Sequence, residues 1–199
     1  MRNIVMCMAL MLCAFGFDVK AQSVVRAIEG EVAFTGVRAS HNMIFDESRP
    51  GLGLAGELRY NFHSVPVDIG IQGRGQIWGR QSLSESASDE YKYAGEKLNY
   101  LSANVLLVSD YNFRRGQSVS MFIGAGVGVA FFEENSSLER AGYSLYVGNG
   151  KSRSFCFMPR VGAEFFNRLR LTLFYQFEDK ANECFGLQVG LAIGGGMKK

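Results

Sequence analysis

Residues 168–178 read Arg-Leu-Arg-Leu-Thr-Leu-Phe-Tyr-Gln-Phe-Glu, and an apolar or aromatic side chain stands at every second position from Leu169 to Phe177. Because successive side chains of a β-strand point to opposite faces, this segment has one apolar face and one mostly polar face. Residues 118–132 and 155–166 show the same period of two. The sequence therefore predicts strands that separate an apolar environment from a polar one.

Segments with this alternation fill most of the chain. The predicted strands cover residues 26–38, 51–63, 66–79, 97–112, 118–132, 154–166, 168–178 and 184–196. Three connections are short, at 63–66, 113–117 and 167, and the others run over 39–50, 80–96, 133–153 and 179–183. Short turns at one rim and mostly longer loops at the other are typical of an all-β fold, the eight-stranded antiparallel up-and-down transmembrane β-barrel.

The composition agrees with one domain, or two at most, for a chain of 199 residues. Lys and Arg total 21 against 19 for Asp and Glu, so a dominant nucleic-acid surface is excluded. The hydrophobic content of 47% is too high for a disordered chain. The mean hydropathy of +0.02 resembles that of a soluble protein, but it averages an apolar row of side chains with a polar one.

The first 21 residues have the features of a secretory signal. Arg2 supplies the positive start, and an apolar run follows over residues 4–17. Val19-Lys20-Ala21 then precedes a cleavage site ahead of Gln22. The run is too short for a transmembrane helix, which needs about 20 residues. We therefore expect a signal peptide at 1–21 and an outer-membrane β-barrel domain at 22–199.

The choice between a membrane barrel and a soluble barrel depends on which face is outside. Lysines after the signal stand at 92, 97, 151, 180, 198 and 199, outside the strand interiors, although a water-facing strand tolerates lysine freely. The polar face also carries small residues such as Gly124 and Gly126, which suit a crowded lumen. Aromatic residues near the strand ends are typical of membrane interfaces. The predicted girdle comprises Tyr60, Phe62, Tyr111, Phe113, Phe131, Phe155, Phe165, Tyr175 and Phe177.

Two segments carry a family resemblance: Met-Phe-Ile-Gly-Ala-Gly-Val-Gly-Val-Ala-Phe-Phe at 121–132 and Pro-Arg-Val-Gly-Ala-Glu-Phe-Phe at 159–166. With the signal and the eight strands, they resemble small outer-membrane barrels of the OmpA, OmpX and OmpW type. The resemblance covers the mature chain and concerns architecture. It implies the outer membrane of a Gram-negative bacterium, with both termini periplasmic. One departure is the ending Gly-Gly-Gly-Met-Lys-Lys, where many such barrels end in an aromatic residue.

The polar face places arginine, glutamate and glutamine side chains inside the predicted barrel, where an unpaired charge is costly. The predicted lumen network comprises Glu31, Glu57, Arg59, Arg74, Arg160, Glu164, Arg170 and Gln176, with Gln72 and Gln188. We expect this network to plug the barrel, and a narrow channel for small or hydrophobic solutes is the alternative. Asp68 and Asp110 are expected to be solvated near the periplasmic rim. A bulge near Gly73 and Gly75 would shift the strand phase in 66–79.

Catalytic candidates are few. Ser40 adjoins His41 and Ser64 adjoins His63, which leaves a lipid A-modifying enzyme, a deacylase or acyltransferase, as a further alternative. Adjacent residues on a strand point apart and neither pair has a carboxylate partner, so we expect no enzyme. We also expect no cofactor and no metal, because the His and Cys residues lack ligand spacing.

The remaining expectations concern thiols and partners. Cys156 and Cys184 fall on the lumen face two strands apart, about 9–10 Å, so free thiols are expected. We expect the partners to be outer-membrane lipid and lipopolysaccharide, with an extracellular ligand contacting loops 80–96 and 133–153. We predict a monomer with a structural or surface-interaction role. We expect no nucleic-acid partner.

Overall fold

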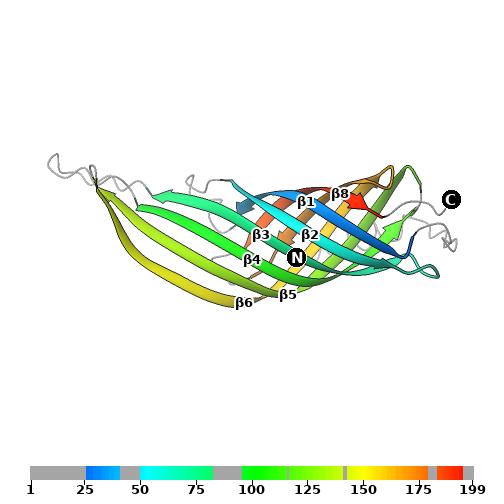
Figure 1. The fold of residues 1–199 in the computed structure, drawn as a ribbon, viewed down its shortest axis with the longest axis horizontal. Coiled ribbons are helices and arrows are strands. Elements are labelled where there is room, and N and C mark those ends of the chain that lie inside the picture. Colours follow the sequence, from blue (N-terminus) through cyan, green and yellow to red (C-terminus); the bar gives the residue numbers. More distant parts are fainter. Residues whose placement is uncertain are drawn as a thin grey trace, which may run out of the picture.

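A computed structural model describes residues 26–40, 50–82, 96–115, 117–140, 143–178 and 183–194. These residues form eight strands and no helix (Figure 1). The strands are β1 (Ile28–Ala39), β2 (Gly51–Asn61), β3 (Val67–Ser82), β4 (Glu96–Phe113), β5 (Val119–Arg140), β6 (Tyr143–Phe165), β7 (Leu169–Gln176) and β8 (Cys184–Ile193). The predicted signal peptide, residues 1–21, lies outside the described residues.

The eight strands form one closed barrel in sequence order, which confirms the predicted fold class. Each strand pairs antiparallel with its neighbours, and the β1–β8 ladder from Gly30–Ile193 to Ala39–Cys184 closes the sheet. Closure gives the backbone amides of both terminal strands a partner, so the closed part of the sheet has no open edge. In the described part of the chain, no helix is long and apolar enough to cross a membrane.

Burial in this barrel is the reverse of burial in a water-soluble barrel. Large apolar side chains lie on the outside, as shown by Phe34 with 73% and Leu52 with 71% of its surface exposed. The inward positions between them hold polar and charged groups, and Arg59 and Arg170 are at most 2% exposed. The period of two in the sequence therefore separates an apolar outer wall from a polar lumen.

The two rims of the barrel differ. The short connections 62–66, 114–118 and 166–168 share one rim, here called the turn end, with the start of β1 and the end of β8. The other four connections lie at the opposite rim, the loop end, and they include the two-residue link between β5 and β6. Arg114, Phe166 and Asn167 adopt a positive φ of 52–54° in the tight turns, a conformation that is uncommon for residues other than glycine.

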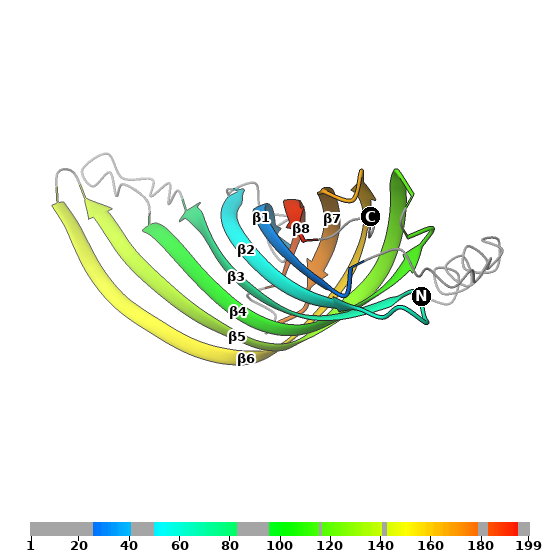
Figure 2. The ribbon, with the colours of Figure 1, turned by 45° about the vertical axis from the view of Figure 1, so that its right-hand side comes forward.

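Strands β5 and β6 are much longer than the sequence predicts, and the expected loop at 133–153 is wrong. The two strands stay paired from Val119–Phe165 to Arg140–Tyr143, with one register shift between Ser136 and Ser137. Figure 2 shows this hairpin extending far beyond β1 and β8. The other six strands match their predicted bounds to within three residues. Alternation marks a strand only where one face is apolar, so a strand that continues beyond the apolar belt leaves no such pattern.

The strand phase of 66–79, which the sequence left open, is continuous. The β2–β3 and β3–β4 ladders show no register shift over this segment. Arg74 points into the lumen, whereas its neighbours Gly73 and Gly75 are exposed on the outer face. A side chain at either glycine would meet open space. No bulge is therefore needed to place Arg74 inside.

Candidate functional site

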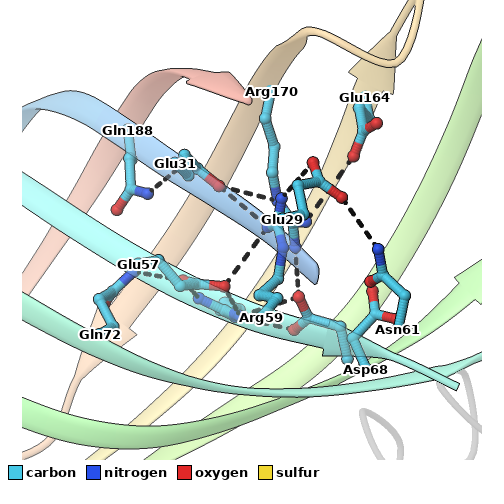
Figure 3. A network of polar contacts seen from close by, with 12 residues as sticks. Glu29, Glu31, Glu57, Arg59, Asn61, Asp68, Gln72, Glu164, Arg170 and Gln188 are labelled. Atoms are coloured by element: carbon cyan, nitrogen blue, oxygen red, sulfur yellow. Dashed lines mark hydrogen bonds and ion pairs between the residues drawn. The ribbon is translucent and has the colours of Figure 1, made fainter. Parts of the chain in front are cut away.

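The lumen near the turn end holds a network of buried ion pairs, part of which Figure 3 shows. Arg59 on β2 donates to Glu29 and Glu31 on β1, each at 2.9 Å, and to Glu57 at 3.3 Å. Gln188 on β8 donates to Glu31 at 2.8 Å. The side chains of Arg59 and its three carboxylate partners are no more than 5% exposed. One guanidinium thus joins three carboxylates from two neighbouring strands.

Arg160 on β6 crosses the lumen to carboxylates on two other strands. Its Nη1 and Nη2 donate to the two oxygens of Glu57 on β2 at 2.6 and 2.9 Å. Its Nε and Nη2 donate to the two oxygens of Asp110 on β4, both at 2.8 Å. The guanidinium therefore makes a bidentate contact with each carboxylate, which is the strongest geometry for such pairs.

Arg170 on β7 completes this layer. It pairs with Asp110, lies 3.6 Å from Glu31 and lies 3.8 Å from Glu164. Its guanidinium also stacks on the ring of Phe122, 3.6 Å from the ring centroid. Carboxylates and guanidinium groups from β1, β2, β4, β6 and β7 thus meet in one interior cluster, in which unpaired charge would be strongly unfavourable.

The turn end of the lumen is covered by a residue that strand alternation does not reveal. Arg115 lies in the β4–β5 turn, pairs with Asp68, and donates to Asn61 Oδ1 at 3.0 Å and to the Phe62 carbonyl at 3.2 Å. Asn112 also donates to Asp68 at 2.6 Å. The expectation that Asp68 and Asp110 are solvated is wrong, because inward-facing guanidinium groups cover both carboxylates, and they are 4% and 1% exposed.

Arg74 and Gln176 lie in a separate group nearer the loop end. Arg74 donates to Gln176 at 3.2 Å and to Gln72 at 2.9 Å, and lies 3.8 Å from the centroid of the Phe174 ring. Gln72 also donates to Glu57 at 2.8 Å, which links the two groups. The predicted network residues therefore all lie inside the barrel, but Arg74 meets amides and an aromatic ring instead of carboxylates. Gln176 accepts from Arg74 and donates to Glu178, outside the charged layer.

The sequence also missed an apolar part of the lumen. Phe174 beside Arg74 belongs to a cluster of buried inward side chains on the loop side of the charged layer: Val37, Leu106, Val108, Ala130, Phe132, Cys156, Met158, Phe174 and Cys184. Cys156 and Cys184 are free thiols, as expected, and both are fully buried. These residues share the inward phase of the charged groups, but they interrupt polar rows, and of them only Cys156 and Cys184 were singled out from the sequence.

One ionisable group lies just beyond this cluster, after the end of β7. Burial raises the pKa of Glu178 to about 7, and a hydrogen bond from Gln176 opposes part of the shift. The carboxyl group therefore changes charge near neutral pH.

The aromatic residues of the predicted girdle lie on the outer wall, near both rims. Tyr60 and Phe62 make an edge-to-face pair with ring centroids 5.1 Å apart, and Tyr111 and Phe113 make another at 5.0 Å. Phe177 at the loop end lies 4.5 Å from Tyr175 and 6.0 Å from Phe157 by ring centroids. Phe131 and Phe155 are exposed near the loop end, and Phe165 is half-buried near the turn end.

The catalytic candidates of the sequence do not assemble into a site in the described part of the chain. Ser40 shares a 2.5 Å hydrogen bond with Tyr175, whose hydroxyl donates to Glu183 at 3.0 Å. His41 lies outside the described residues. His63 and Ser64 are exposed in the β2–β3 turn. Within the described ranges, no group of three or more His, Cys, Asp or Glu side chains is placed to hold a metal ion.

Comparisons with known proteins give structural matches only. No family model matches the chain, and no curated protein sequence matches it. Neisserial surface protein A is 13% identical over 85% of this chain and 98% of its own, with a TM-score of 0.43. Ail of Yersinia pestis is 13% identical over 88% and 98%, with a TM-score of 0.47. A major outer membrane protein from Thermus thermophilus is 12% identical over 84% and 100%, with a TM-score of 0.46. At these identities the likeness concerns the fold alone.

Proposed function

We propose that this chain is an outer-membrane barrel whose lumen is closed and whose role is structural or surface-interacting. The apolar outer wall supports the membrane location, because exposed side chains such as Phe34 and Leu52 would be unfavourable in water. Residues 1–21 then act as the cleaved signal and 22–199 as the barrel domain. The start of β1 and the end of β8 lie at the turn end, which faces the periplasm in this proposal.

The proposal that the lumen is closed rests on one observation, the position of Arg160. Its bidentate contacts to Glu57 and Asp110 connect β6 with β2 and β4 through the interior. An eight-stranded barrel has an interior just wide enough for side chains to fill. Ion pairs cross that interior and occupy the path that a solute would take. Arg115 covers them at the turn end, and the apolar cluster covers them on the loop side.

The surface role is supported by the part of the sheet that continues past the closed barrel. Beyond the Phe157–Phe177 bridge, β6 has β5 on one side and no partner on the other among the described residues. An open strand edge can pair with an extended segment of another protein. We propose that an extracellular ligand is contacted by this hairpin, within 133–153, and by the neighbouring segment 80–96.

Planar-bilayer recording of the purified wild-type barrel tests the closed lumen. We expect no stepwise conductance, and we expect heat-modifiable mobility on gels as evidence of a folded membrane barrel. Discrete conductance steps in the wild type that change size in Arg160→Ala would refute the closed lumen and establish the channel alternative. Lipid profiling of cells with and without the protein tests the non-enzymatic role, and an altered lipid A would contradict it.

A further inference from the structure

We propose that the turn-end rim binds the phosphate groups of anionic phospholipids in the adjoining membrane leaflet. This inference rests on the proposed membrane location and deepens it. Each described connection at this rim carries an exposed basic side chain: Arg26 before β1, His63 in the β2–β3 turn, Arg114 in the β4–β5 turn and Arg168 in the β6–β7 turn. The described residues of these connections include no Asp or Glu.

The spacing of these residues around the barrel decides what kind of partner fits. The strands close in sequence order, so the four connections recur at every second strand around the rim. The basic side chains are therefore distributed around the whole circumference. A protein that docks on one side would meet only a fraction of them, whereas a lipid leaflet surrounds the barrel and meets all of them.

The acidic groups near this rim do not cancel the positive charge. Asp68 lies inside the lumen, where it pairs with Arg115 and accepts a hydrogen bond from Asn112. Glu164 also belongs to the lumen and faces Arg170 at 3.8 Å. The carboxylates are thus bound to interior guanidinium groups, while Arg114 and Arg168 remain exposed to the surroundings.

The aromatic residues next to the turns fix the depth of the rim. The Tyr60–Phe62 and Tyr111–Phe113 pairs flank two of the turns on the outer wall. Phe166 lies beside Arg168, is 73% exposed, and holds a φ of 54°. Tyrosine and other amphipathic rings prefer the headgroup level of a bilayer. Arginine side chains one or two residues beyond this level reach the lipid phosphates, with which guanidinium groups form bidentate contacts.

Lipid selectivity of the full barrel in vesicles tests this proposal. The barrel is reconstituted in phosphatidylcholine with trace spin-labelled phosphatidylglycerol or phosphatidylcholine, and the motionally restricted fraction of each label is measured. An arginine near an anionic lipid surface contributes about a fivefold preference. We expect wild type to enrich phosphatidylglycerol several-fold, and Arg114→Gln with Arg168→Gln to abolish most of that enrichment. High salt should reduce it as well.

Matched variants distinguish lipid binding at the turn-end rim from a general effect of positive charge on the barrel. Lys151→Gln with Arg153→Gln removes two exposed basic residues at the loop end, of which Lys151 is already paired with Glu133 at 3.6 Å, and it should reduce the enrichment less than the rim variant does. Equal losses in both double variants, or no enrichment in the wild type, would overturn the rim assignment. Wild-type binding to peptidoglycan without any lipid preference would also overturn it. Failure of the wild type to insert into vesicles would instead refute the membrane location, so the two failures are distinguishable.

Discussion

Replacing Arg160 with methionine is the most direct test of the charge network. The substitution keeps much of the side-chain volume but removes four hydrogen bonds to Glu57 and Asp110. Breaking a buried pair by removing one partner costs about 3–5 kcal/mol. Glu57 retains contacts from Arg59 and Gln72, and Asp110 retains Arg170. The expected loss is therefore near the lower limit, about 3 kcal/mol.

Urea unfolding of the barrel in phospholipid vesicles measures this loss, and retained heat-modifiable mobility shows that the variant still folds. Arg153→Met, at an exposed position, serves as the matched control and should cost less than about 0.5 kcal/mol. Adding Glu57→Gln to Arg160→Met should cost less than the sum of the single changes, with a coupling of about 1–3 kcal/mol. A loss below about 1 kcal/mol, or strict additivity, would refute the reasoning that these charges depend on each other.

The glycine faces, the buried Glu178 carboxyl and the long hairpin each allow a separate test. Gly128→Ala should lower the free energy of unfolding in urea by about 1–3 kcal/mol, because the added methyl would overlap the Val105 carbonyl. Gly73→Ala places its methyl in open space and should cost nothing. Equal costs would contradict the assignment of these two glycines to crowded and open surroundings. Burial raises the pKa of Glu178 from its ordinary 4.5 to about 7, so between these pH values the folded state holds a proton that the unfolded state releases. The free energy of unfolding should therefore fall as the pH rises from about 4.5 to about 7, by at most about 3 kcal/mol. Glu178→Gln should flatten that pH profile, and an unchanged profile would show that this carboxyl is not the source of the pH dependence. Replacing 137–147 by a short turn should leave heat-modifiable mobility intact, since these residues lie beyond the closed barrel; loss of that mobility would show that the hairpin is needed for folding.

The sequence predicted the barrel well because one physical signal governs it. Each crossing strand has apolar residues on one face and polar residues on the other, and the signal recurs eight times. The same parity puts Glu57, Arg160 and most of the other network residues on the inward face, where their side chains are buried. Parity gives only the direction of a side chain, however. It does not tell which carboxylate on one strand reaches which arginine on another, because that depends on the stagger of the closed sheet.

The missed features have different causes. Arg115 covers the lumen from a turn, where alternation ends. Glu29 lies within the predicted strand 26–38 and shares the inward phase of Glu31, so alternation could have placed it in the lumen. Asp68 and Asp110 were assigned to solvent by their position near a rim, although interior arginines cover them. The β5–β6 extension was missed because backbone pairing continues where both faces are polar, and only the structure records that pairing.

The charged lumen also explains how the strands keep their register. Shifting a strand by one residue exchanges its two faces. In a barrel with apolar residues on both faces, such a slip would cost little in a lipid environment. Here, a one-residue slip of β6 would turn Arg160 into the hydrocarbon layer and leave Glu57 and Asp110 without their bidentate partner. A charge in the membrane interior costs at least about 2.5 kcal/mol, and the orphaned carboxylates add to that cost. The network that we propose closes the lumen therefore also selects the native register over its nearest alternatives.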